Sequence, residues 1–215
     1  MKVNSPRTLR AEQVQLTRKR IMDAAEALFR TRGYGPTTLQ AVAAAAGVAV
    51  ETVYSRFRNK TTLLSAILES GIMGAVEGRD VLEQTEVSRI RASTDQTEQV
   101  RLLAAFSRGI LERTDAAHRI LRSAAAVDDA AFELQQRDTL RRIEGQRFYI
   151  EMLLANGPLR EGLTPAEAAD TYSALASPET FAFLVGERGW SADQFQMWLR
   201  DMLTCALLPR PMHFA

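Results

Sequence analysis

The sequence predicts an all-α fold, with a small N-terminal helical domain followed by a larger helical body. Apolar residues recur at helical spacing along most of the 215 residues, and no stretch of useful length alternates between apolar and polar residues as a half-buried strand does. Glycine, proline and capping residues interrupt this pattern at intervals that suit helices of ordinary length. These observations together indicate helices that pack on one another without a sheet.

The N-terminal helices are expected to be short and closely spaced. The first is predicted over 17–32, where apolar residues recur every three or four positions and Gly33 follows as a helix stop. Threonines that can cap a second helix come next, and Gly47 closes that helix after roughly eight residues. A third helix is expected over 49–56, and a fourth begins near Lys60.

The rest of the chain is predicted to form successive helices after a polar, Ser/Thr-rich break over 78–95. Pro178 should kink or split one of these helices, because proline lacks the backbone N–H and clashes with the preceding turn. The helices expected in this part of the chain span 97–113, 115–126, 128–155, 165–188 and 191–208.

Charge is distributed unevenly along a chain whose net charge is only +1. Residues 1–65 contain 11 Lys+Arg and 4 Asp+Glu, a net charge of +7, whereas residues 66–215 contain 16 and 22, a net charge of −6. Random fluctuation is one explanation. A basic head that meets an acidic partner such as nucleic acid is the other, and it requires a second signal in the same segment.

That second signal is a helix-turn-helix pattern over about 38–57, two short helices joined by a turn that contains glycine. The small side chain of Ala43 allows the two helices to cross closely. In such a motif the second helix enters the major groove of DNA, while the first crosses the phosphate backbone. The motif and the basic charge therefore both predict DNA binding.

Residues in and around this motif fall at a familiar spacing: Gly33-Tyr34, Thr37-Thr38-Leu39, Val42-Ala43, Ala46-Gly47-Val48, Thr52-Val53-Tyr54, Phe57 and Asn59-Lys60-Thr61-Thr62-Leu63-Leu64. Over about residues 17–65 the chain thereby resembles the DNA-binding domain of the TetR family of bacterial regulators. One departure is Ala49, where the family often has a capping serine. The resemblance implies a homodimeric repressor that leaves a palindromic DNA operator when a small-molecule effector binds, with no cofactor.

Position by position, the resemblance also implies which side chains meet DNA. Hydroxyls and cations are expected on phosphate oxygens, and three further side chains near base edges. The implied phosphate contacts are Thr38, Thr52, Tyr54, Arg56 and Lys60, and the implied base contacts are Gln40, Val50 and Glu51. Structural interpretations remain open for some of them: Thr38 as a helix cap alone, Tyr54 as a core aromatic, and Glu51 as a merely solvated carboxylate.

The domain organisation follows from these assignments. Residues 1–16 are polar and basic and contain Pro6, so we expect a flexible basic arm. Its arginines, and those just after it, can follow phosphates, reach into the minor groove or stay solvated. The DNA-binding domain is expected over 17–77, and a helical regulatory and dimerisation domain over 78–215.

The middle helices contain apolar residues that suit either an effector pocket or a packed core. The residues proposed to bind a ligand are Leu103, Phe106, Ile110, His118, Phe132, Phe148 and Met152. His118 lies beside apolar residues, where a satisfied core histidine is the alternative, and no metal site is indicated.

The last two helices contain more aromatic surface than the end of a small domain requires. Two such helices from each subunit would form a four-helix bundle, as the family resemblance implies. The residues expected in this dimer interface are Tyr172, Leu175, Phe181, Phe195, Trp198 and Met202. Packing of these aromatics within one subunit is the alternative.

Enzymatic activity is not expected, because the sequence lacks a glycine-rich phosphate loop, a Cys/His ligand spacing and an evident nucleophile–base pair. The single cysteine, Cys205, lies among apolar residues and is expected in the core. Without an apolar run of membrane length or a signal peptide, we expect a cytoplasmic protein, on the nucleoid when bound to DNA. The alternative function is a helical ligand-binding protein that does not bind DNA.

Overall fold

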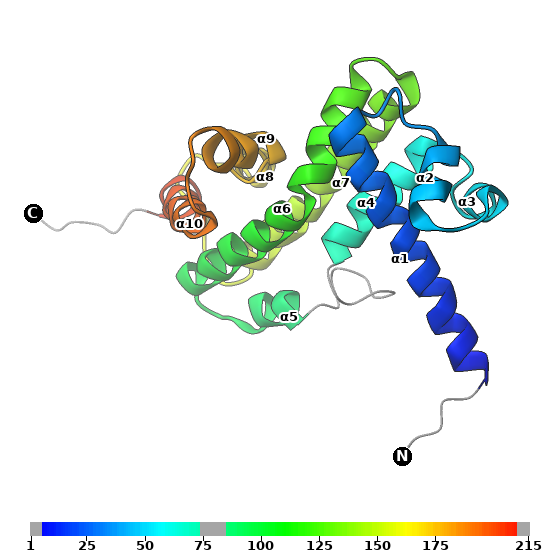
Figure 1. Ribbon diagram of the computed structural model, residues 1–215. Helices are drawn as coiled ribbons and strands as arrows, with labels where there is room; N and C mark the ends of the chain where they lie inside the picture. Colours follow the sequence, from blue (N-terminus) through cyan, green and yellow to red (C-terminus); the bar gives the residue numbers. More distant parts are fainter. Residues whose placement is uncertain (1–5, 74–84, 210–215) are drawn as a thin grey trace, which may run out of the picture. The chain divides into compact units, whose positions relative to one another are not determined.

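The computed structural model describes residues 6–73 and 85–209, and within these ranges every regular element is a helix (Figure 1). The predicted all-α fold is confirmed. The chain divides into two compact units. The N-terminal unit consists of Met1–Ser70 and Ala116–Gln135, and the C-terminal unit consists of Gly71–Asp115 and Gln136–Ala215. No helix in the described ranges is both long and apolar enough to cross a membrane.

Helix α1 spans Pro6–Arg32 and is much longer than expected. The prediction of a flexible arm is wrong for residues 6–16, which are helical, while residues 1–5 lie outside the described residues. The segment begins with a proline, which is well tolerated in the first helical turn, and continues with Arg, Leu, Ala, Glu and Gln, which favour helix without an apolar stripe. In residues 12–16 the missing stripe reflects exposed side chains on a regular helix.

Helices α2 (Leu39–Ala46) and α3 (Val50–Phe57) form the predicted helix-turn-helix. The Thr38 side chain caps α2 by accepting a hydrogen bond from the Ala41 backbone N–H at 3.1 Å. Gly47 ends α2 in the left-handed conformation, with φ 64°. Ala49 begins α3 without a side-chain cap, as its methyl group dictates. Helix α4 (Lys60–Met73) follows directly.

The N-terminal unit is built around one apolar core. Buried residues from α1 to α4 share it, including Ile21, Val42, Val53 and Leu64, each at most 1% exposed. Residues 116–135 add buried positions such as Leu121. The short helices of the motif are thus held by long ones on which they pack.

Helices α6 (Gln96–Ala125) and α7 (Asp129–Leu154) each contribute residues to both units. The break expected between 113 and 115 is wrong, because α6 continues through it. Thr114 is fully buried there, and its hydroxyl donates to the Ile110 carbonyl oxygen at 2.9 Å, so the polar side chain is satisfied inside the helix.

The polar segment 78–95 also contains a helix that the sequence pattern did not indicate, α5 (Thr85–Ala92). Only two of its residues, Val87 and Ile90, are buried, which is too little apolar periodicity to predict a helix from the sequence. The boundary expected between residues 77 and 78 lies outside the described residues.

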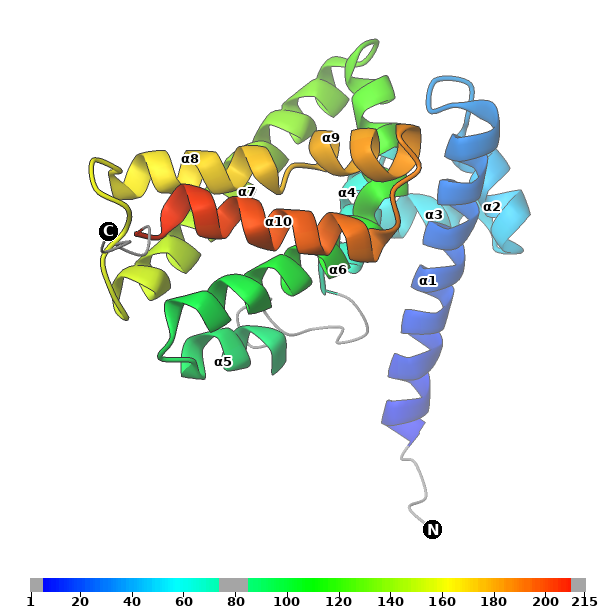
Figure 2. The same ribbon diagram turned by 90° about the vertical axis from the view of Figure 1, so that its left-hand side faces the viewer.

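The C-terminal helices are α8 (Pro165–Leu175), α9 (Pro178–Phe181), the π-helix η2 (Ala182–Glu187) and α10 (Ala192–Leu207), and α8 and α10 lie side by side (Figure 2). The predicted kink or split at Pro178 is confirmed, and it is a split: α8 ends at Leu175 and α9 begins at Pro178. Capping boxes at Thr164 and Ser191 begin α8 and α10. The core of this unit contains Leu103, Ile150 and Phe195, each at most 1% exposed.

The turn of the helix-turn-helix gives a first testable prediction. In Gly47→Ala, a left-handed residue acquires a Cβ, which would lie 2.9 Å from Nη2 of Arg20. We expect the free energy of unfolding to fall by about 1–2 kcal/mol in urea titrations followed by circular dichroism. Gly35→Ala is the control, because its Cβ would meet no atom of the described residues within 4 Å. Equal stability of the two variants would contradict the prediction.

The core of the C-terminal unit gives a second testable prediction. Phe195 is fully buried, and its ring lies 4.9 Å from that of Phe181. Phe195→Ala should lower the free energy of unfolding by about 3–5 kcal/mol, because a cavity replaces a packed ring. Leu140→Ala, at a position of α7 that is 62% exposed, should change it by less than about 0.5 kcal/mol. A mild effect of Phe195→Ala would place this ring at a subunit surface instead.

Candidate nucleic-acid interface

The exposed side of the helix-turn-helix joins α2 and α3 through a side-chain hydrogen bond. Gln40 Nε2 donates to the Tyr54 hydroxyl at 3.2 Å. Tyr54 is 44% exposed, which excludes the core-aromatic interpretation. Because its hydroxyl accepts from Gln40, the hydroxyl proton remains available for a phosphate oxygen. Gln40 is also exposed and keeps its carbonyl oxygen and second N–H.

The remaining residues of the predicted DNA set lie on the same two helices with different exposure. Glu51 is exposed at the start of α3, whereas Thr52 and Arg56 are half-buried. Val50 is half-buried and packs against the core of the N-terminal unit, so only part of its methyl surface is accessible. Thr38 is exposed, and its cap bond uses only an oxygen lone pair, so its O–H can still donate.

Lys60 begins α4 and uses its ammonium group within the protein. Its Nζ donates to the carbonyl oxygens of Tyr34, at 2.8 Å, and Gly35, at 3.0 Å, and lies 4.4 Å from the centre of the Tyr34 ring. Tyr34 also shares a hydrogen bond with Thr61, and burial raises the pKa of its hydroxyl. An ammonium has three N–H donors, so one remains for a phosphate. Lys60 therefore ties the turn before α2 to α4.

Three basic residues of α1 that follow the expected arm also contact the protein itself. Arg20 Nη2 donates to the Ala46 carbonyl oxygen at 2.6 Å, and Arg18 lies 5.3 Å from the centre of the Phe57 ring. Lys19 pairs with an aspartate one turn further on. No sequence pattern indicates the structural role of Arg20, because a hydrogen bond from a side chain to a carbonyl 26 residues away leaves no local signal.

The residues predicted to line a ligand pocket do not all fall in one unit. Leu103, Phe106, Ile110, Phe148 and Met152 belong to the C-terminal unit, where the first two are buried and the others half-buried.

His118 and Phe132 belong to the N-terminal unit. His118 is 8% exposed, but Phe132 is 48% exposed, so its expected place on a buried apolar face is wrong. Ala131 and Leu134 occupy the buried face of this helix, and position 132 points away from it.

The dimer prediction is corrected for its three most buried members. Tyr172, Phe181 and Phe195 are at most 3% exposed within a single chain, so they form its core and no subunit surface. The Tyr172 hydroxyl shares a 2.8 Å hydrogen bond with Ser107, and burial raises its pKa to about 12. Apolar periodicity marks a residue for burial without saying whether its own chain or a partner covers it.

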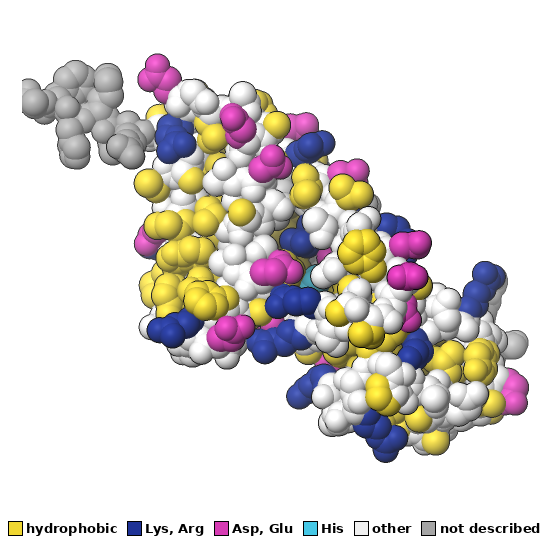
Figure 3. Space-filling model, turned by 90° about the horizontal axis from the view of Figure 1, so that it is seen from above, with side chains coloured by type: hydrophobic (Ala, Val, Ile, Leu, Met, Phe, Trp, Pro, Cys, Tyr) yellow, Lys and Arg dark blue, Asp and Glu magenta, His cyan; other side chains and the backbone are white. Residues whose placement is uncertain are grey.

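Other residues of the C-terminal helices do reach the surface. Leu175 and Trp198 are half-buried, and Met202 is 37% exposed. Figure 3 shows hydrophobic side chains gathered on the surface near the helices that precede the C-terminus. The expectation that Cys205 is a core residue is wrong, because it is exposed. It lies two residues beyond the buried Leu203, on a different side of α10.

Comparison with known proteins agrees with this geometry. A family model described as "Bacterial regulatory proteins, tetR family" matches residues 21–67. The HTH-type transcriptional regulator TtgR of Pseudomonas putida is 31% identical over 183 residues, which cover 81% of this chain and 80% of TtgR. ArpR, a probable HTH-type transcriptional regulator of the same species, matches with the same identity and coverage.

Among solved structures, SmeT, described as the repressor of the Stenotrophomonas maltophilia multidrug efflux pump SmeDEF, is 27% identical. The match covers 90% of this chain and 91% of SmeT, with a TM-score of 0.65. None of these relatives supports the alternative of a ligand-binding protein without DNA binding. A helix-turn-helix with an exposed polar face and relatives of this length and identity together show that the chain belongs to the TetR family and is a DNA-binding transcriptional regulator.

Proposed function

We propose that the protein is a homodimeric repressor that binds a palindromic operator and leaves it when a small molecule occupies the C-terminal unit. The observation that carries this proposal is the exposed Gln40–Tyr54 pair on the helix-turn-helix of a head with net charge +7. We expect it to act in the bacterial cytoplasm, on the nucleoid when bound to its operator.

On DNA, the two residues of this pair have different tasks. The free hydroxyl proton of Tyr54 suits a phosphate oxygen, and such contacts fix the position of the protein without reading sequence. Gln40 retains one donor and one acceptor, the pair that recognises adenine in the major groove. Its bond to Tyr54 links the base contact to the phosphate contact, so the glutamine side chain is oriented before DNA arrives.

The dimer interface is proposed on the exposed apolar parts of the C-terminal helices. Leu175, Trp198 and Met202 remain from the sequence prediction, and Phe183 and Met197, 51% and 52% exposed, extend the apolar surface. Two copies of α8 and α10 would bury this surface in a four-helix bundle. A two-fold dimer matches a palindrome because each recognition helix meets an identical half-site.

Release by a small molecule is supported by the relatives. SmeT is described as a repressor of a multidrug efflux pump, and one SmeT structure, with a TM-score of 0.66 and 24% identity, is a complex with triclosan. A ligand similar to triclosan could make apolar contacts with three half-buried residues of the C-terminal unit, Ile110, Phe148 and Met152. Binding of such a ligand and of the operator must oppose each other by the same factor.

The DNA contact of Tyr54 is tested by Tyr54→Phe. We expect roughly three- to tenfold weaker binding both to a genomic fragment selected by the protein and to a random duplex, because a lost phosphate contact carries no sequence preference. Fluorescence anisotropy titrations measure both affinities, with Ser88→Ala, an exposed hydroxyl of α5, as control. Unchanged affinity for both duplexes would remove Tyr54 from the interface.

The dimer surface is tested by Met202→Glu. A carboxylate buried between subunits is costly, so sedimentation should show monomers that keep the helical circular dichroism signal and lose operator affinity. Leu140→Glu is the matched control, since Leu140 is 62% exposed on α7 and lies outside the proposed interface. A dimer of unchanged strength in Met202→Glu contradicts the assignment.

A further inference from the structure

The residue directly after the recognition helix α3 has an unusual backbone. Arg58 adopts φ 46° and ψ −50°, a region that residues with a side chain rarely occupy. The chain closes a γ-turn around it, because the Asn59 N–H donates to the Phe57 carbonyl oxygen. A γ-turn with positive φ at its central residue is rare and strained. Arg58 is therefore held in a conformation that its own Cβ opposes.

The cause of this strain is a short connection between two helices. Helix α3 ends at Phe57 and α4 begins at Lys60, so only Arg58 and Asn59 lie between them. Phe57 is 1% exposed and fixed in the core of the N-terminal unit. Asn59 caps α4, because its Oδ1 accepts from the Thr62 backbone N–H at 2.8 Å. The backbone of Arg58 thus has to bend between two anchored neighbours.

Glycine would adopt this backbone without strain, because it has no Cβ. The chain uses glycine at each other position of positive φ among the described residues, namely Gly33, Gly47, Gly162 and Gly189. An arginine in such a place indicates that its side chain has a task that outweighs the strain.

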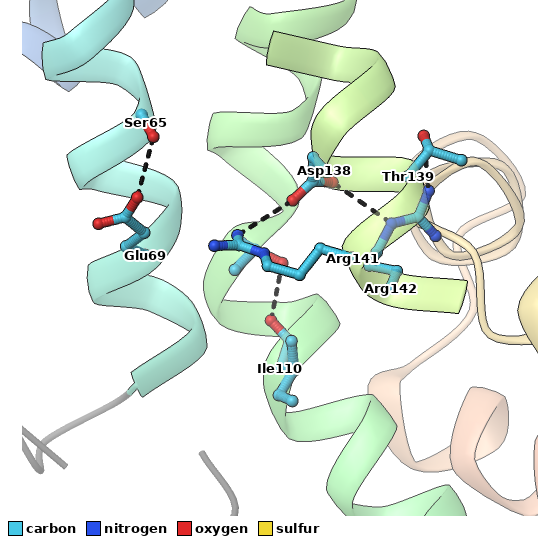
Figure 4. A network of polar contacts seen from close by, with 8 residues as sticks. Ser65, Glu69, Ile110, Asp138, Thr139, Arg141 and Arg142 are labelled. Carbon is cyan, nitrogen blue, oxygen red and sulfur yellow. Dashed lines mark hydrogen bonds and ion pairs between the residues drawn. The ribbon is translucent and has the colours of Figure 1, made fainter. Parts of the chain in front are cut away.

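The Arg58 side chain has no evident task inside the protein. It is exposed, and its guanidinium has no hydrogen bond, ion pair or ring contact within the described ranges. Arginines with a structural role differ from it, as Arg141 and Arg142 do, which contact the buried carboxylate of Asp138 at 3.4 and 3.3 Å (Figure 4). The partner of Arg58 is therefore expected outside the chain.

The place of Arg58 on the motif indicates which partner this is. Val53 and Phe57, each at most 1% exposed, attach α3 to the core, whereas Tyr54 and Ser55 are exposed. Arg58 lies one turn beyond Tyr54, and its N–H donates to the Tyr54 carbonyl oxygen at 3.1 Å, as if the helix continued. The guanidinium thus follows the exposed face of the recognition helix by one turn.

Electrostatics favour a cation at this end of α3. The C-terminal end of a helix carries a partial negative charge, which repels the phosphates of DNA. Arg56 lies in the last turn but is half-buried, whereas Arg58 is exposed. A guanidinium can donate two parallel N–H groups to one phosphate, which compensates the repulsion and fixes the orientation of the helix end.

We propose that Arg58 binds a DNA phosphate at the C-terminal end of the recognition helix, and that the strained backbone is retained for this contact. The residue lies one position beyond the helix-turn-helix pattern of 38–57 and adds to the contacts predicted from the sequence. The inference rests on DNA binding by the motif and is independent of the proposed effector.

The test replaces Arg58 in the full-length protein with glycine, which removes both the charge and the strain. Arg58→Gly should raise the melting temperature, followed by circular dichroism, by about 2–4 °C. In fluorescence anisotropy titrations it should bind both the selected genomic fragment and a random duplex about three- to tenfold more weakly. The slope of log affinity against log salt concentration should fall by about one unit for each recognition helix on the DNA.

Three further variants separate charge from strain. Arg58→Gln keeps the strained Cβ without the charge, so it should lose the same affinity at an unchanged melting temperature. Arg58→Lys keeps the charge and should retain most of the affinity and the wild-type salt slope. Arg147→Gln makes the same change at an exposed position of α7 in the C-terminal unit, and should alter neither quantity.

A gain in stability together with a loss of DNA affinity in Arg58→Gly supports the proposal, because a purely structural arginine would lower both. Wild-type affinity and salt slope in Arg58→Gly or Arg58→Gln would overturn the DNA contact. A lower melting temperature of Arg58→Gly would overturn the claim that the arginine is strained in the folded head. Weaker binding of the selected fragment alone would overturn the phosphate assignment, because it would indicate a contact to a base.

Discussion

The DNA-binding head depends on burying two helices of eight residues, α2 and α3, against longer helices. Isolated helices shorter than about 12 residues are marginal in water, so neither would persist alone. Their apolar sides supply the attachment. Two cations then fix the backbone at the two ends of α2. Arg20 donates to the carbonyl oxygen of the last residue of α2, and Lys60 donates to carbonyl oxygens in the turn before α2. The position of every residue on the exposed face follows from these constraints.

This arrangement changes how basic residues of such a head are interpreted. Positive charge in the sequence indicated a nucleic-acid partner, but Arg18, Arg20 and Lys60 also hold the head together. Substitution of these side chains would therefore mix a loss of stability with a loss of phosphate contacts. Tyr54 is the cleaner probe of the interface, because among the described residues its hydroxyl bonds to another exposed side chain and not to the backbone of the head.

Local chemistry made part of the structure predictable. The Thr38 cap, the left-handed Gly47 and the break at Pro178 each follow from one residue type and its backbone preference. Apolar spacing alone did not predict whether a residue is buried in the core of its own chain or in a subunit interface, because both require the same pattern. Phe195 and Tyr172, expected in the interface, are buried within one chain.

Long-range polar contacts leave even less trace in a sequence. Gln99 and Gln146 were not singled out, since glutamine usually lies on the surface and nothing adjacent marks these two as buried. Thr114 gave a false signal of a helix boundary: threonine often caps the start of a new helix, but here its hydroxyl donates to the Ile110 carbonyl oxygen of the same helix. Only the packed structure distinguishes these cases.

The π-helix η2 has an evolutionary consequence. Its wide turn is closed by the Arg188 N–H on the Phe183 carbonyl oxygen, a hydrogen bond that spans five residues where that of an α-helix spans four. Such turns are rare and accommodate a single inserted residue. Deleting one residue there would restore an ordinary helical turn and rotate the η2 side chains that follow the deletion by about 100° relative to those of α9. A single-codon insertion or deletion in this segment would thus re-aim side chains of η2, among them the exposed Phe183, without touching the helices on either side.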